Sequence, residues 1–220
     1  MIKAEQKKWA YLIFDPYLRR LLKKNFSGFY ISGNTPAADE NKSLVITPNH
    51  FSWWDGFFIY FAASKMLNKK CYMMMLEEQL NRFWFFKKLG AFSVNSKNFV
   101  SLKNTLAYTG DLISDPENMV VIFPQGEIQQ FNTGYRPLKK GLMSVIEKKF
   151  ETTEVMNAAF KIEYGEEKLP YIIGRFGDKI SGESIINNFS AYEDSFYNNI
   201  EKLKSISARD FNSFDLFKKK

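Results

Sequence analysis

The residues best suited to chemistry gather in one short stretch, TPNHFSWWDGFF, which covers residues 47–58. It holds His50, the one histidine among 220 residues, and Asp55 follows five positions later. Histidine readily takes up a proton at neutral pH, and a nearby carboxylate can accept a hydrogen bond from one ring nitrogen, which leaves the other nitrogen as a base. The pair is therefore a candidate general base for a hydroxyl group, and that hydroxyl can belong to the substrate.

The position of His50 along the chain supports a catalytic interpretation over a structural one. A lone histidine is more often a structural residue, and a lone aspartate near a helix start is more often a cap. However, the apolar run of residues 44–47 predicts a strand that ends just before His50, and α/β folds place ligand sites at the carboxyl ends of strands. We therefore favour a general-base role for His50, oriented by Asp55.

A second segment with the character of a site is VVIFPQGEIQQF, residues 120–131. Its apolar part predicts a strand that ends at Pro124, and Gly126 would let the backbone approach a ligand closely. Taken alone, this segment would be interpreted as a simple strand and turn. Its meaning depends on the first segment, which precedes it by about 75 residues.

Together the two segments resemble motifs of the lysophospholipid/glycerolipid acyltransferase family, the PlsC-like enzymes. N-H-x-x-x-x-D at residues 49–55 resembles motif I, in which the histidine is the general base and the aspartate orients it. FPQGE at residues 123–127 resembles motif III, usually F-P-E-G-T, with Gln and Glu at the positions of Glu and Thr. The resemblance implies catalytic roles for His50 and Asp55. We add as candidate substrate-binding residues Ser52, Gln125, Gly126 and Glu127.

A third segment, LGAFSVNSKN at residues 89–98, resembles motif II only in part. In the family this motif ends in an arginine that is linked to the phosphate of the acceptor, and here Asn95 takes that position. Asparagine cannot make a charge-assisted, bidentate phosphate contact, although Lys97 and Arg136 could contribute a charge. We therefore expect an acceptor without a terminal phosphomonoester, such as a glycosylated or aminoacyl lipid or a polyene pigment.

The composition is that of an ordinary globular protein, with 45% hydrophobic and 25% charged residues. Cys71 is the single cysteine, so the chain has no disulfide framework, and one Cys with one His cannot form a structural zinc site. We expect no metal and no cofactor. The resemblance implies acyl-CoA or acyl carrier protein as the acyl donor, which is a co-substrate.

Strand-like and helix-like runs alternate after residue 44, which predicts a single α/β domain over residues 1–220. We expect a central mixed, mostly parallel sheet flanked by helices. The catalytic α/β core would cover residues 30–180, and a C-terminal helix residues 190–220. Residues 1–30 would form an amphipathic two-helix segment, because Asp15 and Pro16 suit the start of a second helix.

The net charge of +7 and the aromatic content of 17% suggest an anionic partner. We find no motif of a nucleic-acid-binding module, so an anionic membrane surface is favoured over nucleic acid. An apolar stripe beside basic side chains supports this, and it consists of Trp9, Leu12, Ile13, Tyr17 and Leu21. No segment has the pattern of a signal peptide or a spanning helix. We expect a cytoplasmic protein, peripheral on the inner face of the cell membrane.

The leading hypothesis is an O-acyltransferase that moves a fatty acyl group from an acyl thioester to a lipid-like hydroxyl acceptor. Two alternatives stay within the same family: a catalytically inactive lipid-binding relative, and a lysophosphatidic acid acyltransferase of phospholipid synthesis. A basic nucleic-acid-binding protein is a third alternative from another class, which gel shifts at varied salt would reveal.

Overall fold

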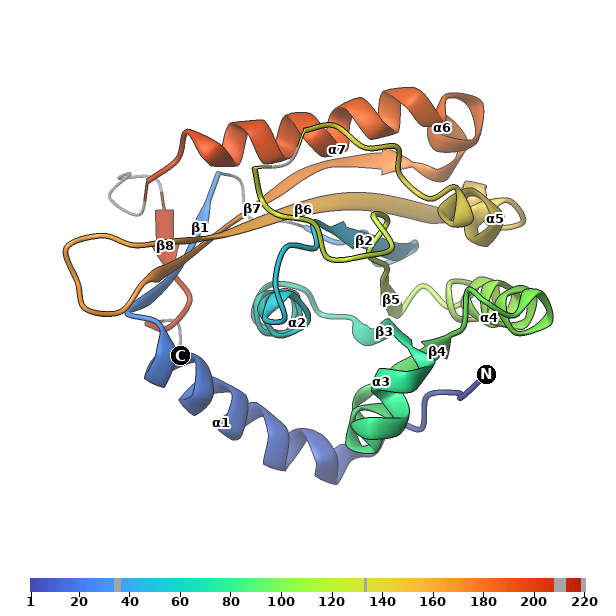
Figure 1. The fold of residues 1–220 in the computed structure, drawn as a ribbon. Coiled ribbons are helices and arrows are strands. Elements are labelled where there is room, and N and C mark those ends of the chain that lie inside the picture. Colours follow the sequence, from blue (N-terminus) through green and yellow to red (C-terminus); the bar gives the residue numbers. More distant parts are fainter. Residues whose placement is uncertain (34–36, 133, 208–212, 219–220) are drawn as a thin grey trace.

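A computed structural model describes residues 1–33, 37–132, 134–207 and 213–218. Within these residues, one sheet has eight strands in the order β4-β3-β5-β2-β6-β7-β1-β8, and helices cover both of its faces (Figure 1). The neighbours from β4 to β6 are all parallel, as are β7 and β1, whereas β6–β7 and β1–β8 are antiparallel. The prediction of a mixed, mostly parallel sheet flanked by helices is confirmed.

The strands and helices have these bounds. The strands are β1 (Gly28–Ser32), β2 (Ser43–Pro48), β3 (Lys70–Leu76), β4 (Ala91–Val94), β5 (Asn118–Val121), β6 (Thr153–Glu163), β7 (Tyr171–Ser181) and β8 (Ser213–Asp215). The α-helices are α1 (Lys8–Asn25), α2 (Asp55–Met66), α3 (Glu77–Arg82), α4 (Phe99–Leu112), α5 (Gly141–Ile146), α6 (Gly182–Asn187) and α7 (Phe189–Lys204). Two short 3₁₀ helices are η1 (Trp84–Leu89) and η2 (Phe150–Thr152).

The sheet separates two hydrophobic cores because successive side chains of a strand point to opposite faces. In β2, Leu44 and Ile46 join the core beneath α1 and α2, and Val45 joins the core beneath α4 to α7. All three are essentially inaccessible to solvent. Burying such a side chain stabilises the fold by roughly 1.5–3 kcal/mol, so β2 is fixed from both sides, and with it the segment that follows.

The N-terminal segment is one helix, α1, so the prediction of two helices was wrong. Pro16 lies inside α1 on its exposed side, where water can solvate the carbonyl group that the missing N–H leaves unpaired. Asp15 caps no helix, since its carboxylate accepts a hydrogen bond from the Tyr60 hydroxyl of α2 at 2.7 Å. Phe14 and Leu18, before and after the proline, are both buried, and this packing keeps the helix continuous.

The C-terminal segment also differs from the expected helix over residues 190–220. Helix α7 ends at Lys204, and the buried Lys161 of β6 donates hydrogen bonds to the carbonyl oxygens of Lys204 and Ile206, at 3.4 and 2.5 Å. These contacts turn the chain away from the helix axis. Residues 208–212 lie outside the described part, and β8 then pairs with β1. The expected helix is therefore shorter, and a strand follows it.

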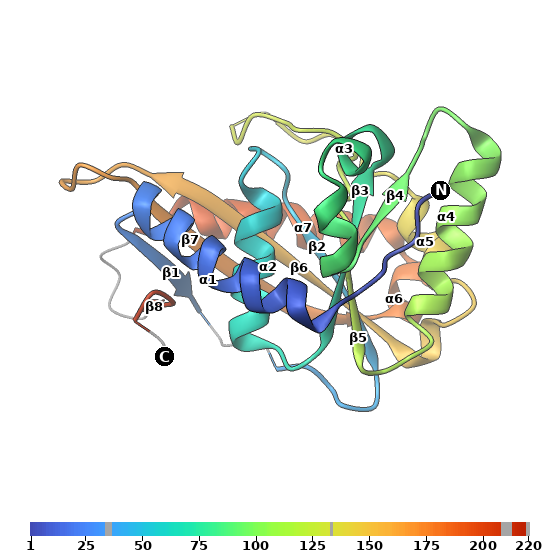
Figure 2. The same ribbon diagram turned by 90° about the horizontal axis from the view of Figure 1, so that it is seen from below.

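Helix α2 lies between α1 and the sheet (Figure 1), and α1 crosses below it when the molecule is seen from beneath (Figure 2). The core takes Ala10, Phe14, Leu18 and Leu22 from α1. The opposite side of α1 leaves four large apolar side chains exposed, namely Trp9, Leu12, Ile13 and Tyr17. Among the described helices, none has the length and hydrophobicity needed to cross a bilayer.

Candidate active site

The polar residues singled out in the sequence lie at one edge of the sheet. The strands from β4 to β6 are parallel, so their carboxyl ends share this edge. His50 follows β2, and Gln125 follows the neighbouring strand β5. This is the edge at which open α/β sheets bind ligands.

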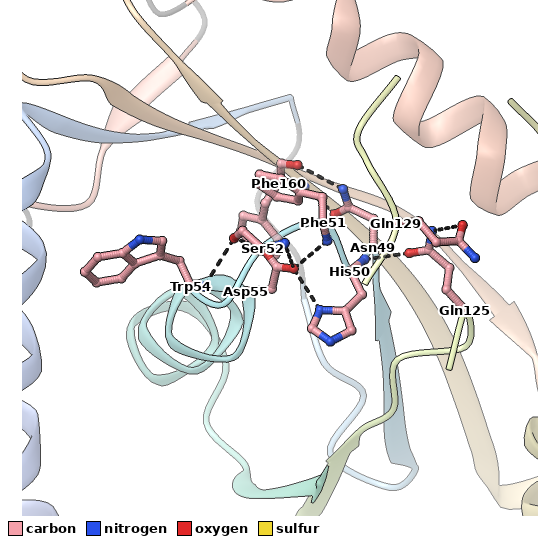
Figure 3. Close-up of polar contacts among 9 residues, drawn as sticks. All are labelled: Asn49, His50, Phe51, Ser52, Trp54, Asp55, Gln125, Gln129 and Phe160. Carbon is pink, nitrogen blue, oxygen red and sulfur yellow. Dashed lines mark hydrogen bonds and ion pairs between the residues drawn. The ribbon is translucent and has the colours of Figure 1, made fainter. Parts of the chain in front are cut away.

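Asp55 is the centre of a dense hydrogen-bond network (Figure 3). The residue is completely buried, and its Oδ2 atom accepts hydrogen bonds from the backbone N–H groups of Phe51 and Ser52, at 2.6 and 2.8 Å. Its Oδ1 atom accepts from the Ser52 hydroxyl at 2.7 Å. Asp55 is also the first residue of α2, where the helix dipole favours a negative charge. A buried carboxylate is thereby supplied with the donors it needs.

The fourth hydrogen bond of Asp55 fixes the imidazole of His50. The His50 Nδ1 atom lies 2.8 Å from Asp55 Oδ2, and a carboxylate can only accept, so Nδ1 carries the proton. The Nε2 atom then presents a lone pair, and no described residue forms a hydrogen bond with it. The Phe123 ring lies 4.4 Å from the imidazole, centroid to centroid, while the His50 side chain stays 24% exposed. The free nitrogen can therefore receive a proton from a substrate.

Two glutamines hold the backbone of His50 from both sides. Gln125 accepts a hydrogen bond from the His50 N–H at 2.5 Å, and the Gln129 N–H donates to the His50 carbonyl at 2.8 Å. The Gln125 Nε2 atom donates to Gln129 Oε1 at 2.7 Å, which joins the two side chains. Gln125 was expected to bind substrate, and the structure places it against the His50 backbone. Gln129 had no part in the sequence-based hypothesis.

Asn49 is a second residue that the sequence reasoning left without a role. It is 3% exposed, its Nδ2 atom donates to the Phe160 carbonyl at 3.0 Å, and its Oδ1 atom accepts from the Phe160 N–H at 2.8 Å. These two bonds fasten the end of β2 to β6. The signal available in the sequence was its place before His50 in N-H-x-x-x-x-D.

Gly126, Glu127 and Arg136 lie in the segment that follows β5. Gly126 has a φ of 75°, and a Cβ atom added there would lie 3.1 Å from the Lys139 side chain, so both the conformation and the space favour glycine. Glu127 and Arg136 form an exposed ion pair with an N–O distance of 3.5 Å. Both charges are at the surface and already pair with each other.

Asn95 and Lys97 lie farther along the edge, after β4. Two strands, β3 and β5, separate β4 from β2, which at ~4.8 Å per strand is roughly 14 Å. The Asn95 amide donates to Glu77 Oε1 at 3.4 Å, and the Lys97 N–H donates to Asn95 Oδ1 at 3.1 Å. A hydrogen bond from Ser93 lowers the pKa of the Glu77 carboxyl, so the group next to Asn95 is an anion.

Comparison with known families gives one match. The family model described as Acyltransferase matches residues 29–157, which is more than half of the chain and includes both motif-like segments. No curated protein matches the sequence. In the part of the chain that the structure describes, no three His, Cys, Asp or Glu side chains are grouped as metal ligands would be.

Comparison with solved structures supports the fold. The chain is similar to the crystal structure of the 1-acyl-sn-glycerophosphate (LPA) acyltransferase PlsC from Thermotoga maritima, with a TM-score of 0.59 and 12% sequence identity. The match covers 89% of this chain and 79% of the Thermotoga chain. At that identity the likeness concerns the arrangement of strands and helices.

Proposed function

The chain belongs to the acyltransferase family, and from this premise we propose that it transfers a fatty acyl group from an acyl thioester to a lipid-like hydroxyl acceptor. The observation that supports the proposal best is the 2.8 Å contact between His50 Nδ1 and Asp55 Oδ2, which leaves Nε2 free at the carboxyl edge of the sheet. In this proposal His50 and Asp55 form a general-base dyad.

The reaction needs no nucleophile from the protein. His50 Nε2 takes the proton of the acceptor hydroxyl while the hydroxyl oxygen attacks the thioester carbonyl carbon. The buried Asp55 carboxylate stabilises the imidazolium that forms. When the tetrahedral intermediate collapses, the C–S bond breaks and the imidazolium returns its proton to the leaving thiolate. The products are an ester and a thiol, and His50 is again neutral.

The donor in this proposal is acyl-CoA or acyl carrier protein, and the acceptor has no terminal phosphomonoester. At the position where the family has an arginine stands Asn95, and its partner is the anionic Glu77. A phosphate bound there would meet a negative charge and no guanidinium, which is unfavourable. Lys97 and Arg136 are exposed, and Arg136 already pairs with Glu127.

We further propose that α1 places the enzyme on the inner face of the cell membrane. Its exposed apolar stripe contains Trp9, Leu12, Ile13 and Tyr17. The same helix carries basic side chains at Arg19, Arg20, Lys23 and Lys24, each worth about 1 kcal/mol near an anionic leaflet. Trp and Leu side chains beside basic groups are typical of helices that lie in the interface.

The surface around α1 continues toward His50 through exposed tryptophans. Trp84 of η1 is 58% exposed and Trp53, in the loop after His50, is 59% exposed. Trp84 and Trp9 each contact the Phe85 ring, and Trp53 contacts Phe57 of α2. A membrane bound at α1 would therefore lie close to the segment that carries the dyad, where a lipid acceptor could enter.

The decisive experiment is an acceptor screen. Purified protein is incubated with radiolabelled acyl-CoA or acyl carrier protein and a total lipid extract, and His50→Ala is tested in parallel. We expect a labelled product with the wild type and a loss of roughly 10²–10⁴-fold with the variant, because a general base is removed. Gln79→Ala, an exposed substitution on α3, serves as the control. Equal turnover by His50→Ala would refute the dyad, and lipid binding without any turnover would indicate an inactive lipid-binding relative.

Vesicle flotation tests membrane binding separately. Binding should be stronger to anionic than to neutral vesicles and weaker at high salt, because exposed charges are screened. Replacing Leu12 and Ile13 by Ser should reduce binding at any salt, while acyl transfer to a soluble acceptor persists. Equal binding of the wild type to both kinds of vesicle would remove the electrostatic part of the proposal.

A further inference from the structure

A polar pocket adjoins His50 on the α7 side of the sheet. Its volume is about 80 Å³, and it lies between the segment 129–135 and α7, with His50 and Gln125 in its lining. Since one water needs roughly 10–15 Å³ by such a measure, the pocket has room for several water-sized groups. The exposed aromatic surface lies with α1 and α2 on the opposite face of the sheet (Figure 1).

One donor in this pocket is buried and unused. The His50 N–H can only donate, so the oxygen of Gln125 must face it, and the nitrogen of Gln125 must face Gln129. That contact requires the oxygen of Gln129, which leaves its Nε2 atom without a described partner, as Figure 3 also shows. Gln129 is only 8% exposed and lines the pocket. A buried NH₂ group needs an oxygen atom to accept its hydrogen bonds.

The remaining walls of the pocket carry no unpaired charge. Glu201 and Lys204 of α7 form an ion pair with each other at 2.7 Å, so neither sign of charge predominates. The rings of Tyr135 and Tyr197 lie 3.9 Å apart between centroids, and their hydroxyls donate to Asp194 and to the Arg136 carbonyl. Amide, hydroxyl and aromatic surfaces without net charge suit a neutral hydroxylated group, whereas a phosphate would require an unpaired cation.

We infer that this pocket binds an uncharged, hydroxylated headgroup of the acceptor, such as a sugar, with Gln129 Nε2 donating a hydrogen bond to one of its oxygen atoms. This inference rests on the proposed function, and it names the class of acceptor that the same site would use. The headgroup would lie on the α7 side of His50, and the acyl chain on the side of α1 and α2.

Direct binding tests the pocket without turnover. The probe is methyl β-D-glucopyranoside, followed by saturation-transfer NMR with wild type, Gln129→Glu and Gln79→Glu. In Gln129→Glu one side-chain oxygen still accepts from Gln125, so the contacts around His50 persist, while the free NH₂ becomes an oxygen. The signal should be present in wild type and Gln79→Glu and be lost in Gln129→Glu. An unchanged signal in Gln129→Glu, or displacement of the glucoside by sn-glycerol 3-phosphate, would overturn the inference.

Kinetics provide the second arm. A monoacyl glucosylglycerol and a lysophosphatidic acid of equal chain length are compared as acceptors. Wild type should prefer the glycolipid in kcat/KM by more than tenfold, and Gln129→Glu should lower its kcat/KM at least roughly fivefold, which corresponds to about one hydrogen bond. A preference for lysophosphatidic acid would refute the inference and leave the dyad intact. If neither acceptor nor any other lipid were acylated, the proposed function would fail, and the glucoside binding would still decide the pocket.

Discussion

The ends of β2 and β4 lie on the same edge of the sheet and are built very differently. After β2, every hydrogen-bonding atom of the Asp55 carboxylate is used, and the backbone of His50 is held on both sides. After β4, the side chain of Asn95 makes a long contact of 3.4 Å with Glu77, and Lys97 is exposed. The first region has one arrangement available to it, and the second can be altered with little disturbance.

This difference suggests a division of labour along the edge. A general base acts only when its geometry is fixed to a fraction of an ångström, so its support must be rigid. Recognition of a headgroup can change by exchange of one side chain. The family's arginine position is occupied by Asn95 within the adjustable region, whereas the histidine and aspartate are kept in the rigid one. The substitutions below test this contrast.

The largest effect is expected from Asp55→Asn. The amide can keep the same pattern, because its oxygen can accept from the three N–H donors and its nitrogen can donate to the Ser52 hydroxyl. Only the negative charge is lost. We expect kcat to fall by at least about 100-fold, with a melting temperature within about 3 °C of wild type. Steady-state kinetics and thermal unfolding check both, and full activity in Asp55→Asn would show that the charge has no catalytic role.

A smaller effect is expected at Gln125. Gln125→Met fills the same space but leaves the His50 N–H without its acceptor, so kcat should fall about tenfold while the KM for the acyl donor stays unchanged. Gln125→Glu should be less impaired, because Gln129 can turn its amide and donate to the new carboxylate. The double variant Gln125→Glu/Gln129→Glu cannot do so and should be the least active. Equal kcat values for all three would mean that this contact does not position His50.

At the end of β4 we expect a change in preference with little loss of activity. Asn95→Arg introduces a guanidinium that can contact phosphate, but Glu77 would compete for it. The ratio of kcat/KM for lysophosphatidic acid to that for a neutral acceptor should rise about threefold in Asn95→Arg. It should rise further, about tenfold, in Asn95→Arg/Glu77→Gln. Acceptor competition assays measure this ratio. A loss of all activity in Asn95→Arg would contradict the view that this region is adjustable.

The smallest effect is expected from Cys71→Ser. Burial raises the pKa of the Cys71 thiol to about 12, so almost no thiolate is present at pH 7, and β3 places the residue five positions before the carboxyl edge. The variant should retain activity within about twofold, and wild type should resist inactivation by iodoacetamide at pH 7. Rapid inactivation, with radiolabelled acyl transferred to Cys71, would indicate covalent catalysis by the thiol in place of direct attack.

The sequence by itself determined the fold class, the family and the most probable base. Alternating strand-like and helix-like runs are local patterns, and they were sufficient for the mixed sheet. His50 and Asp55 are close in sequence, and a turn into a helix brings such residues together without help from the rest of the chain. Their catalytic role stays a prediction, as do the roles of Ser52, Gly126, Glu127 and Arg136.

The tertiary structure alone decided the contacts between distant segments. Asn49 meets Phe160 across 111 positions, and His50 meets Gln125 across 75, and no local pattern encodes such pairings. The same holds for Pro16, where packing of Phe14 and Leu18 overrides a local signal for a helix start. Burial against the core also chose which apolar residues of α1 remain exposed. Local propensities contribute only tenths of a kcal/mol to about 1 kcal/mol per residue, and buried side chains contribute several times more, so packing prevails where the two conflict.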